Sequence, residues 1–143
     1  MAFKAILIKN ADVILGDIGT IGANFKLQVR SVRLTPNTNV QTIKTVDPQG
    51  VFSETDTTEW VLEIAYLDGY DDGEGTAAEL LSQFLFDHSG ELLPFEMRAR
   101  SGGRGWSGDV RIIPGGSGGG QGEWGEQTVS LPLDGQPTKL AAV

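Results

Sequence analysis

The clearest strand pattern in this chain is the stretch TEWVLEIAY, residues 58–66. Every second residue, from Thr58 to Tyr66, belongs to one mainly apolar face, and the residues between them include two glutamates. A period of two residues is that of a β-strand with one face on a core and the other toward water. The pattern stops before Asp68-Gly69, a sequence typical of turns. These residues therefore predict a half-buried strand of an antiparallel β protein.

The same alternation recurs on both sides of this stretch. We expect further strands at residues 3–8, 11–15, 25–34, 95–100, 109–113 and 128–133. Within 25–34 the apolar phase slips by one residue near Arg30-Ser31, which predicts a bulge because an unbroken strand would turn its apolar face outward. Seven or eight short strands in a chain of 143 residues predict a single, mostly β domain. We expect an antiparallel β-sandwich or barrel-like pair of sheets.

Residues 77–88 break this pattern, because their apolar side chains recur at helical spacing. Thr76 and Glu79 form a capping-box pair at the start, and Gly90 is suited to end the helix. We expect this one helix to pack on a sheet face through Leu80, Leu81, Phe84 and Leu85. The only histidine, His88, falls at the helix end, where the helix dipole favours it, and we expect it to be structural.

Two stretches lack a clear period. Residues 35–57 are expected to form a long loop, or else a hairpin with its turn at Asp47-Pro48-Gln49-Gly50. A loop of this length in a compact domain is usually functional or mobile. Residues 114–125 contain the run from Gly115 to Gly120 and are expected to form a flexible surface loop that joins the last two strands.

Composition and charge argue against several classes of function. The chain has no cysteine, which excludes disulfides, thiolate metal sites and a cysteine nucleophile. The formal net charge is −8, and no Lys or Arg lies between Lys44 and Arg98. Such an acidic balance argues against a nucleic-acid-binding protein. It is also typical of an acidic surface that is simply exposed to solvent. No apolar run reaches membrane-spanning length, so we expect neither a transmembrane helix nor a membrane partner.

No catalytic, cofactor-binding or metal-binding residue is predicted. Ser107 lacks the second glycine of a nucleophile elbow, and no Lys follows the glycine run as in a phosphate-binding loop. Acidic residues at 68–74 suit either calcium or a solvated turn, and their spacing is not that of an EF-hand. We therefore do not expect an enzyme. The remaining classes are a carbohydrate- or protein-binding module and a self-assembling structural protein, with Trp60 expected in the core and Trp106 and Trp124 beside the glycine loop.

The order of motifs adds a resemblance. VRLTP at 32–36 and TIKT at 42–45 precede WVLEI at 60–64, and the helix with Leu80-Leu81 follows. FEMR at 95–98, WSGDV at 106–110, a Gly-rich loop and a final VSLPLDGQPT at 129–138 complete the series. This order resembles that of the major tail (tail tube) proteins of long-tailed, non-contractile bacteriophages.

The resemblance implies a fold of two β-sheets flanked by one helix, with no chemistry performed. Subunits would form hexameric rings that stack into a hollow tube in the virion tail, assembled in the cytoplasm of the bacterial host. The implied partners are other copies of the chain, tape-measure and tail-completion proteins, and DNA in transit. The long loop would contact the neighbouring ring. Its expected contact residues are Asn37, Asn39, Val40, Ile43, Lys44, Pro48, Val51 and Phe52.

Acidic residues near the clearest strand acquire a role under this hypothesis. We expect some of Glu54, Asp56, Glu59 and Glu63 to face the lumen, because they lie beside a strand without a basic residue. A lumen lined by carboxylates repels DNA phosphates, so that DNA slides without sticking. Three alternatives stay open: a tube of a contractile tail or secretion system, a capsid decoration or head–tail connector protein, and a secreted binding module.

Overall fold

The computed structural model describes residues 3–16, 23–25, 27–69 and 80–143. Within these residues the chain forms strands and one short helix, α1 (Leu81–Asp87). The strands are β1 (Asp12–Leu15), β2 (Ala23–Asn24), β3 (Val29–Lys44), β4 (Val51–Leu67), β5 (Leu92–Arg98), β6 (Gly105–Arg111), β7 (Glu126–Pro132) and β8 (Thr138–Leu140).

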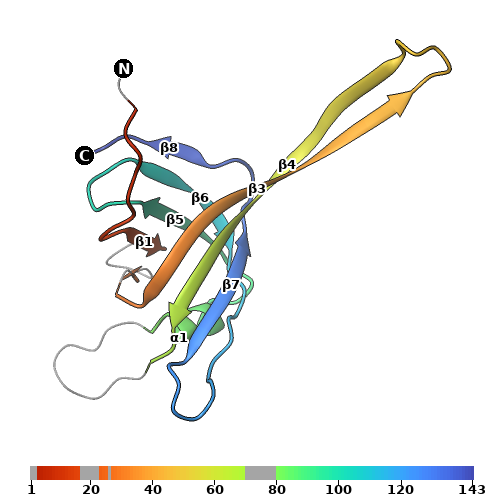
Figure 1. Ribbon diagram of the computed structural model, residues 1–143. Helices are drawn as coiled ribbons and strands as arrows, with labels where there is room; N and C mark the ends of the chain where they lie inside the picture. Colours follow the sequence, from red (N-terminus) through yellow and green to blue (C-terminus); the bar gives the residue numbers. More distant parts are fainter. Residues whose placement is uncertain (1–2, 17–22, 26, 70–79) are drawn as a thin grey trace.

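The strands build two antiparallel sheets that face each other (Figure 1). One sheet has the order β2-β1-β5-β6-β8, and the other has the order β3-β4-β7. Helix α1 lies at the end of the sandwich opposite the free end of the β3–β4 hairpin (Figure 1). The predicted mostly β, antiparallel fold with one helix is confirmed.

The core lies between the two sheets and is formed by buried residues of β1, β3, β4, β5, β6 and β7, together with residues of α1. On β4, Leu62, Ile64 and Tyr66 are all 0% exposed, which is the face that the alternation predicts. From the opposite sheet, Val13 and Val110 are 1% and 0% exposed. Burial of each such side chain contributes about 1.5–3 kcal/mol, so this layer accounts for the cohesion of the sandwich.

Strands β3 and β4 are far longer than the rest, with 16 and 17 residues. They pair antiparallel along their whole length, from Val29–Tyr66 to Lys44–Val51. The register shift between Val29 and Ser31 confirms the predicted bulge. The stretch expected as a long loop, residues 35–57, is instead the continuation of this hairpin, with its turn at the alternative position, 47–50.

Two strand predictions near the N-terminus are wrong. Residues 3–8 form no strand, and Phe3 and Leu7 are 92% and 67% exposed, so this apolar run lies on the buried face of neither sheet. Residues 27–28 form a turn instead of a strand, since the buried Phe25 closes it by accepting a hydrogen bond from the N–H of Gln28 at 2.9 Å. The short strands β2 and β8 were not predicted.

Helix α1 begins later than its apolar stripe suggests. Leu80 is the residue before the helix, and its carbonyl accepts the first bond, from the N–H of Phe84 at 2.8 Å. The N–H of Leu81, the first helical residue, donates a hydrogen bond to the side-chain oxygen of Gln28 at 2.9 Å. The start expected at residues 77–79, with its capping pair, lies outside the described residues. Gly90 has the left-handed φ of 87° expected after the helix.

Candidate assembly surfaces

The distal part of the hairpin leaves the sandwich as a two-stranded ribbon, which we call the arm, residues 39–57 (Figure 1). From Asn39 to Gln49, and again from Val51 to Asp56, every residue is exposed. Thr38 and Thr58, whose hydroxyl oxygens are 3.0 Å apart, pair at its base. The arm therefore has no core on either of its faces.

The turn at the arm's tip is tightly closed. The carboxylate of Asp47 accepts a hydrogen bond from the N–H of Gln49 at 3.0 Å, and its carbonyl accepts one from Gly50 at 2.8 Å. The N–H of Thr45 then binds the carbonyl of Gly50 at 2.7 Å. A Cβ atom at Gly50 would overlap the hydroxyl of Thr45, so only glycine fits there. The sequence thus builds an ordered hairpin end.

Apolar side chains lie on both faces of the arm. Ile43 and Phe52 are directly paired and share one face, with exposed fractions of 67% and 63%. Val40 and Val51 belong to the other face and are also exposed. A lone two-stranded ribbon is at best marginally stable in water, and exposed apolar groups add to that cost. The expected contact residues all lie on the arm, except Asn37, which lies at its base.

The acidic residues expected at a lumen lie on or near one surface. Glu54, Glu59 and Glu63 occupy the face of β4 opposite the core, which we call the outer face of the three-stranded sheet. Asp56 falls in the register shift between the Thr38–Thr58 and Val40–Thr55 pairs.

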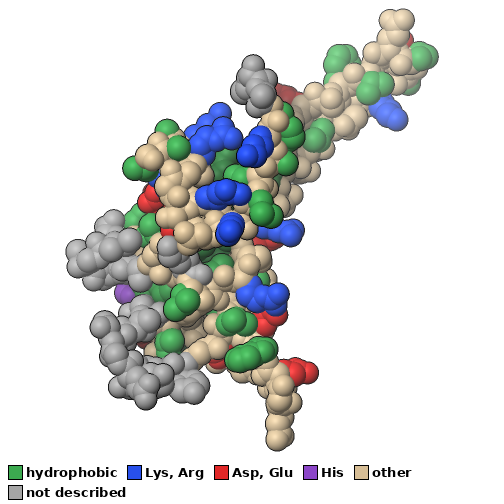
Figure 2. All heavy atoms as spheres, turned by 60° about the vertical axis from the view of Figure 1, so that its left-hand side comes forward, with side chains coloured by type: hydrophobic (Ala, Val, Ile, Leu, Met, Phe, Trp, Pro, Cys, Tyr) green, Lys and Arg blue, Asp and Glu red, His purple; other side chains and the backbone are tan. Residues whose placement is uncertain are grey.

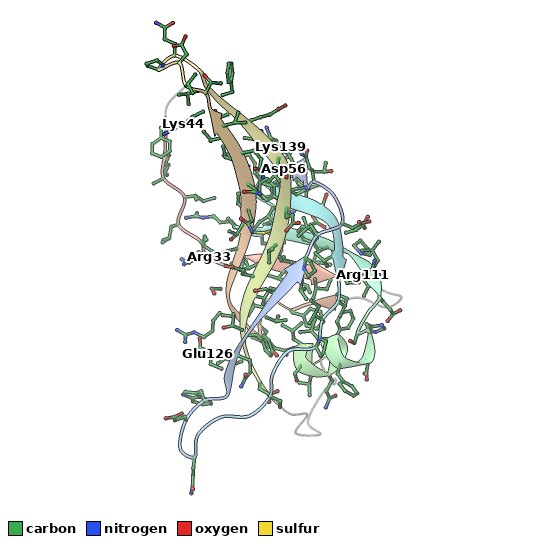
Figure 3. All side chains as sticks on the ribbon, turned by 90° about the vertical axis from the view of Figure 1, so that its right-hand side faces the viewer. Arg33, Lys44, Asp56, Arg111, Glu126 and Lys139 are labelled. Carbon is green, nitrogen blue, oxygen red and sulfur yellow. The ribbon has the colours of Figure 1, made fainter. Side chains whose placement is uncertain are left out.

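The outer face also contains a basic residue that the sequence of β4 did not show. Arg33 of β3 is paired with Glu63 across the sheet, and an ion pair of 2.8 Å joins Arg30 to Glu126 at the sheet's lower end. Figure 3 shows Arg33 and Glu126 on the side of this sheet away from α1. Strand β4 itself has no basic residue, as its sequence shows, but strand pairing brings Arg33 beside Glu63.

Helix α1 attaches to the core through its apolar stripe. Leu81, Phe84 and Leu85 are 0%, 2% and 0% exposed, whereas Leu80 is half-buried at the helix start. The ring of Phe84 lies 5.1 Å from that of Phe25. These contacts fix the helix at the end of the sandwich.

Asp68 fastens the Gly-rich loop, residues 114–125, to the sandwich. Its carboxylate accepts hydrogen bonds from the hydroxyls of Ser117 and Ser82 and from the N–H groups of Gly118 and Gly69. The bond from Ser117 contributes most to lowering the pKa of Asp68 below its ordinary value. The carboxylate is thus held charged between the loop and the helix.

The same loop approaches β4 and β7 closely. The hydroxyl of Tyr66 donates to the carbonyl of Gly116 at 2.8 Å, and burial raises the pKa of this phenol. A Cβ atom at Gly115 would overlap the Tyr66 hydroxyl, and one at Gly116 would meet the side chain of Gln127. The loop was expected to be flexible and to join the last two strands; it is fastened at several points, and it joins β6 to β7, after which β8 follows.

The three tryptophans occupy two separate places. Trp60 was expected in the core but is half-buried, with its ring 6.4 Å from that of Trp106. This pair lines a shallow groove of about 270 Å³, whose other lining residues are Thr58, Gln136, Pro137 and Lys139. Trp124 is 87% exposed at the tip of the Gly-rich loop. The tryptophans therefore form no continuous platform.

The part of the chain that the structure describes offers little for catalysis. No group of three or more metal-ligating side chains occurs within it, and Asp71, Asp72 and Glu74 of the acidic turn lie outside it. His88 follows the helix, 4.6 Å from the ring of Phe84 and 2.6 Å from the carboxylate of Glu91. No helix among these residues has the length and apolar character needed to cross a membrane.

Comparison with known proteins identifies the fold. No family model matches this chain, and no curated sequence does. A chain from the virion of a native gene transfer agent (GTA) particle has a TM-score of 0.61 and 17% identity, over 91% of this chain and 95% of that one. A chain from the tail of an empty GTA particle, determined with C6 symmetry, has a TM-score of 0.62 and 17% identity, over 91% and 96%. The protein therefore shares its fold with a component of a phage-like tail.

Proposed function

We propose that this chain is a structural subunit of a phage-like tail tube. Six copies form a ring, rings stack into a tube, and DNA passes through the lumen without any chemistry by the subunit. The tube is assembled in the host cytoplasm and becomes part of the virion tail, where tape-measure and tail-completion proteins are its further partners. The shared fold with a C6-symmetric GTA tail component supports the choice of six.

The observation that carries this proposal is the exposed arm. A ribbon with apolar side chains on both faces needs a partner surface to cover it. A second copy of the chain supplies that surface in a homo-oligomer, and contacts between different patches repeat without limit when copies stack head to tail. The arm is therefore assigned to the contact between one ring and the next.

The sheet edges support closure of each ring. Among the described strands, β3 and β7 form the two edges of the three-stranded sheet. Open edges invite pairing with other chains, and a closed ring of subunits removes them. When β3 of one subunit meets β7 of its neighbour, the three-stranded sheets join into one barrel. The outer face, with Glu59 and Glu63, then lines the lumen.

Electron microscopy of the purified, concentrated protein tests the assembly directly. The proposal predicts hollow tubes of uniform width with six-fold end views. Rings that never stack, or trimers, would favour a connector or capsid decoration protein instead. A chain that stays monomeric at high concentration, even with pre-formed tube ends added as seeds, would contradict the proposal.

A shortened arm sharpens this test. Val40 and Thr55 are directly paired, so residues 41–54 can be replaced by Asn-Gly, a two-residue turn suited to such a pair. We expect a folded monomer that forms no tubes. Gln49→Ala is the matched control, because it alters the tip but keeps the arm's length. Normal tubes from the shortened chain would overturn the role of the arm.

A further inference from the structure

Next to the turn at the end of the Gly-rich loop lies an aromatic side chain that the described residues leave largely uncovered. Trp124 is 87% exposed, and Glu123 beside it is exposed too. The turn is closed by a hydrogen bond from the N–H of Glu123 to the carbonyl of Gly120 at 3.1 Å. The loop behind it is fastened by Asp68 and Tyr66. A tryptophan held out by an ordered loop is the kind of residue that anchors protein interfaces.

The groove at the other end of the sandwich has matching chemistry. Its base is the Trp60–Trp106 pair, and Lys139 lies on its rim. An adjoining hollow of about 380 Å³ shares Trp106 and Lys139 and adds Arg104 and Met97. Figure 2 shows Lys and Arg side chains gathered over the upper and central part of the visible face. The groove combines aromatic rings with Lys139, and the adjoining hollow adds Arg104, whereas the end of the loop combines an aromatic ring with a carboxylate.

The two features lie at opposite ends of the molecule. Glu126, two residues after Trp124, pairs with Leu67, whereas Trp60 lies seven residues back along β4. At roughly 3.3 Å per residue this separates loop tip and groove by about 20 Å or more. Figure 3 likewise shows Lys139 and Glu126 toward opposite ends of the body. A subunit cannot insert Trp124 into its own groove, so a Trp124 that fills the groove would belong to another copy.

We propose that Trp124 of one subunit inserts into the Trp60–Trp106 groove of the next copy, with Glu123 facing Lys139. The contact joins unlike ends of two copies, so it repeats along a stack. The groove lies at the end from which the arm leaves, as Thr58 belongs to both the groove and the arm's base. This inference rests on the tube proposed above. In that tube, one copy contributes its arm and its groove to the interface, and the other copy contributes its Gly-rich loop.

Disulfide trapping tests the contact without depending on tubes. The chain has no cysteine, so Glu123→Cys, which keeps Trp124 in place, and Gln136→Cys can be made as separate proteins and mixed under oxidising conditions. Gln136 is exposed and lines the groove. We expect a mixed disulfide dimer, since such bonds form only between Cα atoms about 4.4–6.8 Å apart. Ser89→Cys, at an exposed position beyond the helix, replaces Gln136→Cys as the control and should give none.

Charge exchange supplies a second, quantitative readout. Trp124→Ala should raise the concentration needed for assembly at least about 10-fold, as expected when an interface anchor is truncated. Glu123→Lys and Lys139→Glu should each raise it, and their combination should recover most of the loss. Circular dichroism checks that every variant is folded, as expected for changes at exposed positions.

The outcomes separate the two proposals. A 123–136 cross-link in a protein that forms no tubes supports the contact and overturns only the tube. Tubes that form at the same concentration with Trp124→Ala overturn the contact and leave the tube intact. Absence of the cross-link in a mixture that assembles normally also overturns the contact.

Discussion

Strand β4 passes through two different environments. In its second half, Leu62, Ile64 and Tyr66 are 0% exposed between two sheets. In its first half, Phe52 is 63% exposed on a ribbon with no core on either face. Both halves pair with β3 in antiparallel register, apart from the bulge between Val29 and Ser31 and a register shift at the arm's base. Backbone pairing is therefore similar along the strand, and what differs is burial.

This difference separates folding from assembly. The body buries enough apolar surface to fold alone, because its alternate residues meet a second sheet. The arm gains little from side-chain burial within its own chain, so in the proposed assembly its apolar residues act when another copy covers them. We expect substitutions in the body to change the stability of the monomer, and substitutions in the arm to change association.

The largest contrast comes from truncating one side chain in each half of β4. Leu62→Ala should lower the free energy of unfolding by about 2–5 kcal/mol, through lost burial and a cavity. Phe52→Ala should change it by no more than about 0.5 kcal/mol, since it is an exposed substitution. Urea unfolding of the two monomers measures both. Similar losses for the two would show that the arm is part of the monomer's cooperative fold.

A paired change on one face of the arm should act on assembly instead. Ile43→Ser with Phe52→Ser removes both apolar groups of that face, and we expect the concentration needed for assembly to rise at least about 10-fold. Light scattering against concentration measures this. Thr42→Ala with Ser53→Ala, a pair on the opposite face, is the control for the number of changes. An unchanged threshold for the Ile43 and Phe52 variant would exclude that face from the contact.

Charge reversal on the outer face should have a smaller effect, visible only with DNA. Glu59→Lys with Glu63→Lys should let assembled tubes retain short duplex DNA at low salt, because the phosphates then meet cations. Added salt should reverse the retention. Asp87→Lys with Asp134→Lys, at two exposed positions outside the three-stranded sheet, is the control for the same change in net charge. Equal retention by wild-type and reversed tubes would argue against a lumen at this face.

The smallest effect concerns pH and the Gly-rich loop. Because the folded protein lowers the pKa of Asp68, its carboxylate stabilises the fold above the ordinary aspartate pKa. That contribution is lost as the pH falls below 3.8 and through the lowered pKa. The urea midpoint of Ser117→Ala should therefore depend less on pH in this range, since the main donor to the carboxylate is gone. Parallel pH profiles for wild type and variant would contradict this role for Ser117.

The sequence predicted those parts of the fold whose alternation has a cause in burial. Residues 58–66 alternate because one face meets the core, and the slip near Arg30 marks a real bulge. The arm has no buried face to impose a period, so its strands were predicted only as an alternative to a loop. The apolar run at 3–8 suggested a strand, but these residues are exposed, and an apolar run alone does not show whether a sheet will bury it.

Residues of the candidate surfaces were only partly predictable. Those on the arm followed from the resemblance of motif order, while Arg33 came to the acidic face through strand pairing. The Gly-rich loop was interpreted as flexible. Composition does not show whether glycines make a loop flexible or let its backbone pack closely against other residues. Its glycines at 115 and 116 are required by Tyr66 and Gln127, which lie about fifty and eleven residues away in sequence. A tryptophan within such a glycine-rich run was the available signal for the loop tip.

Hydrogen exchange along β4, measured before and after assembly, tests whether a second copy of the chain covers the arm. The account predicts that amides of residues 60–66 are protected in the monomer and stay so, whereas those of residues 51–56 exchange fast in the monomer and become protected in tubes. Arm amides that exchange as fast in tubes as in the monomer would contradict the claim that a second copy covers the arm. Arm amides already protected like the body in the monomer would contradict it as well.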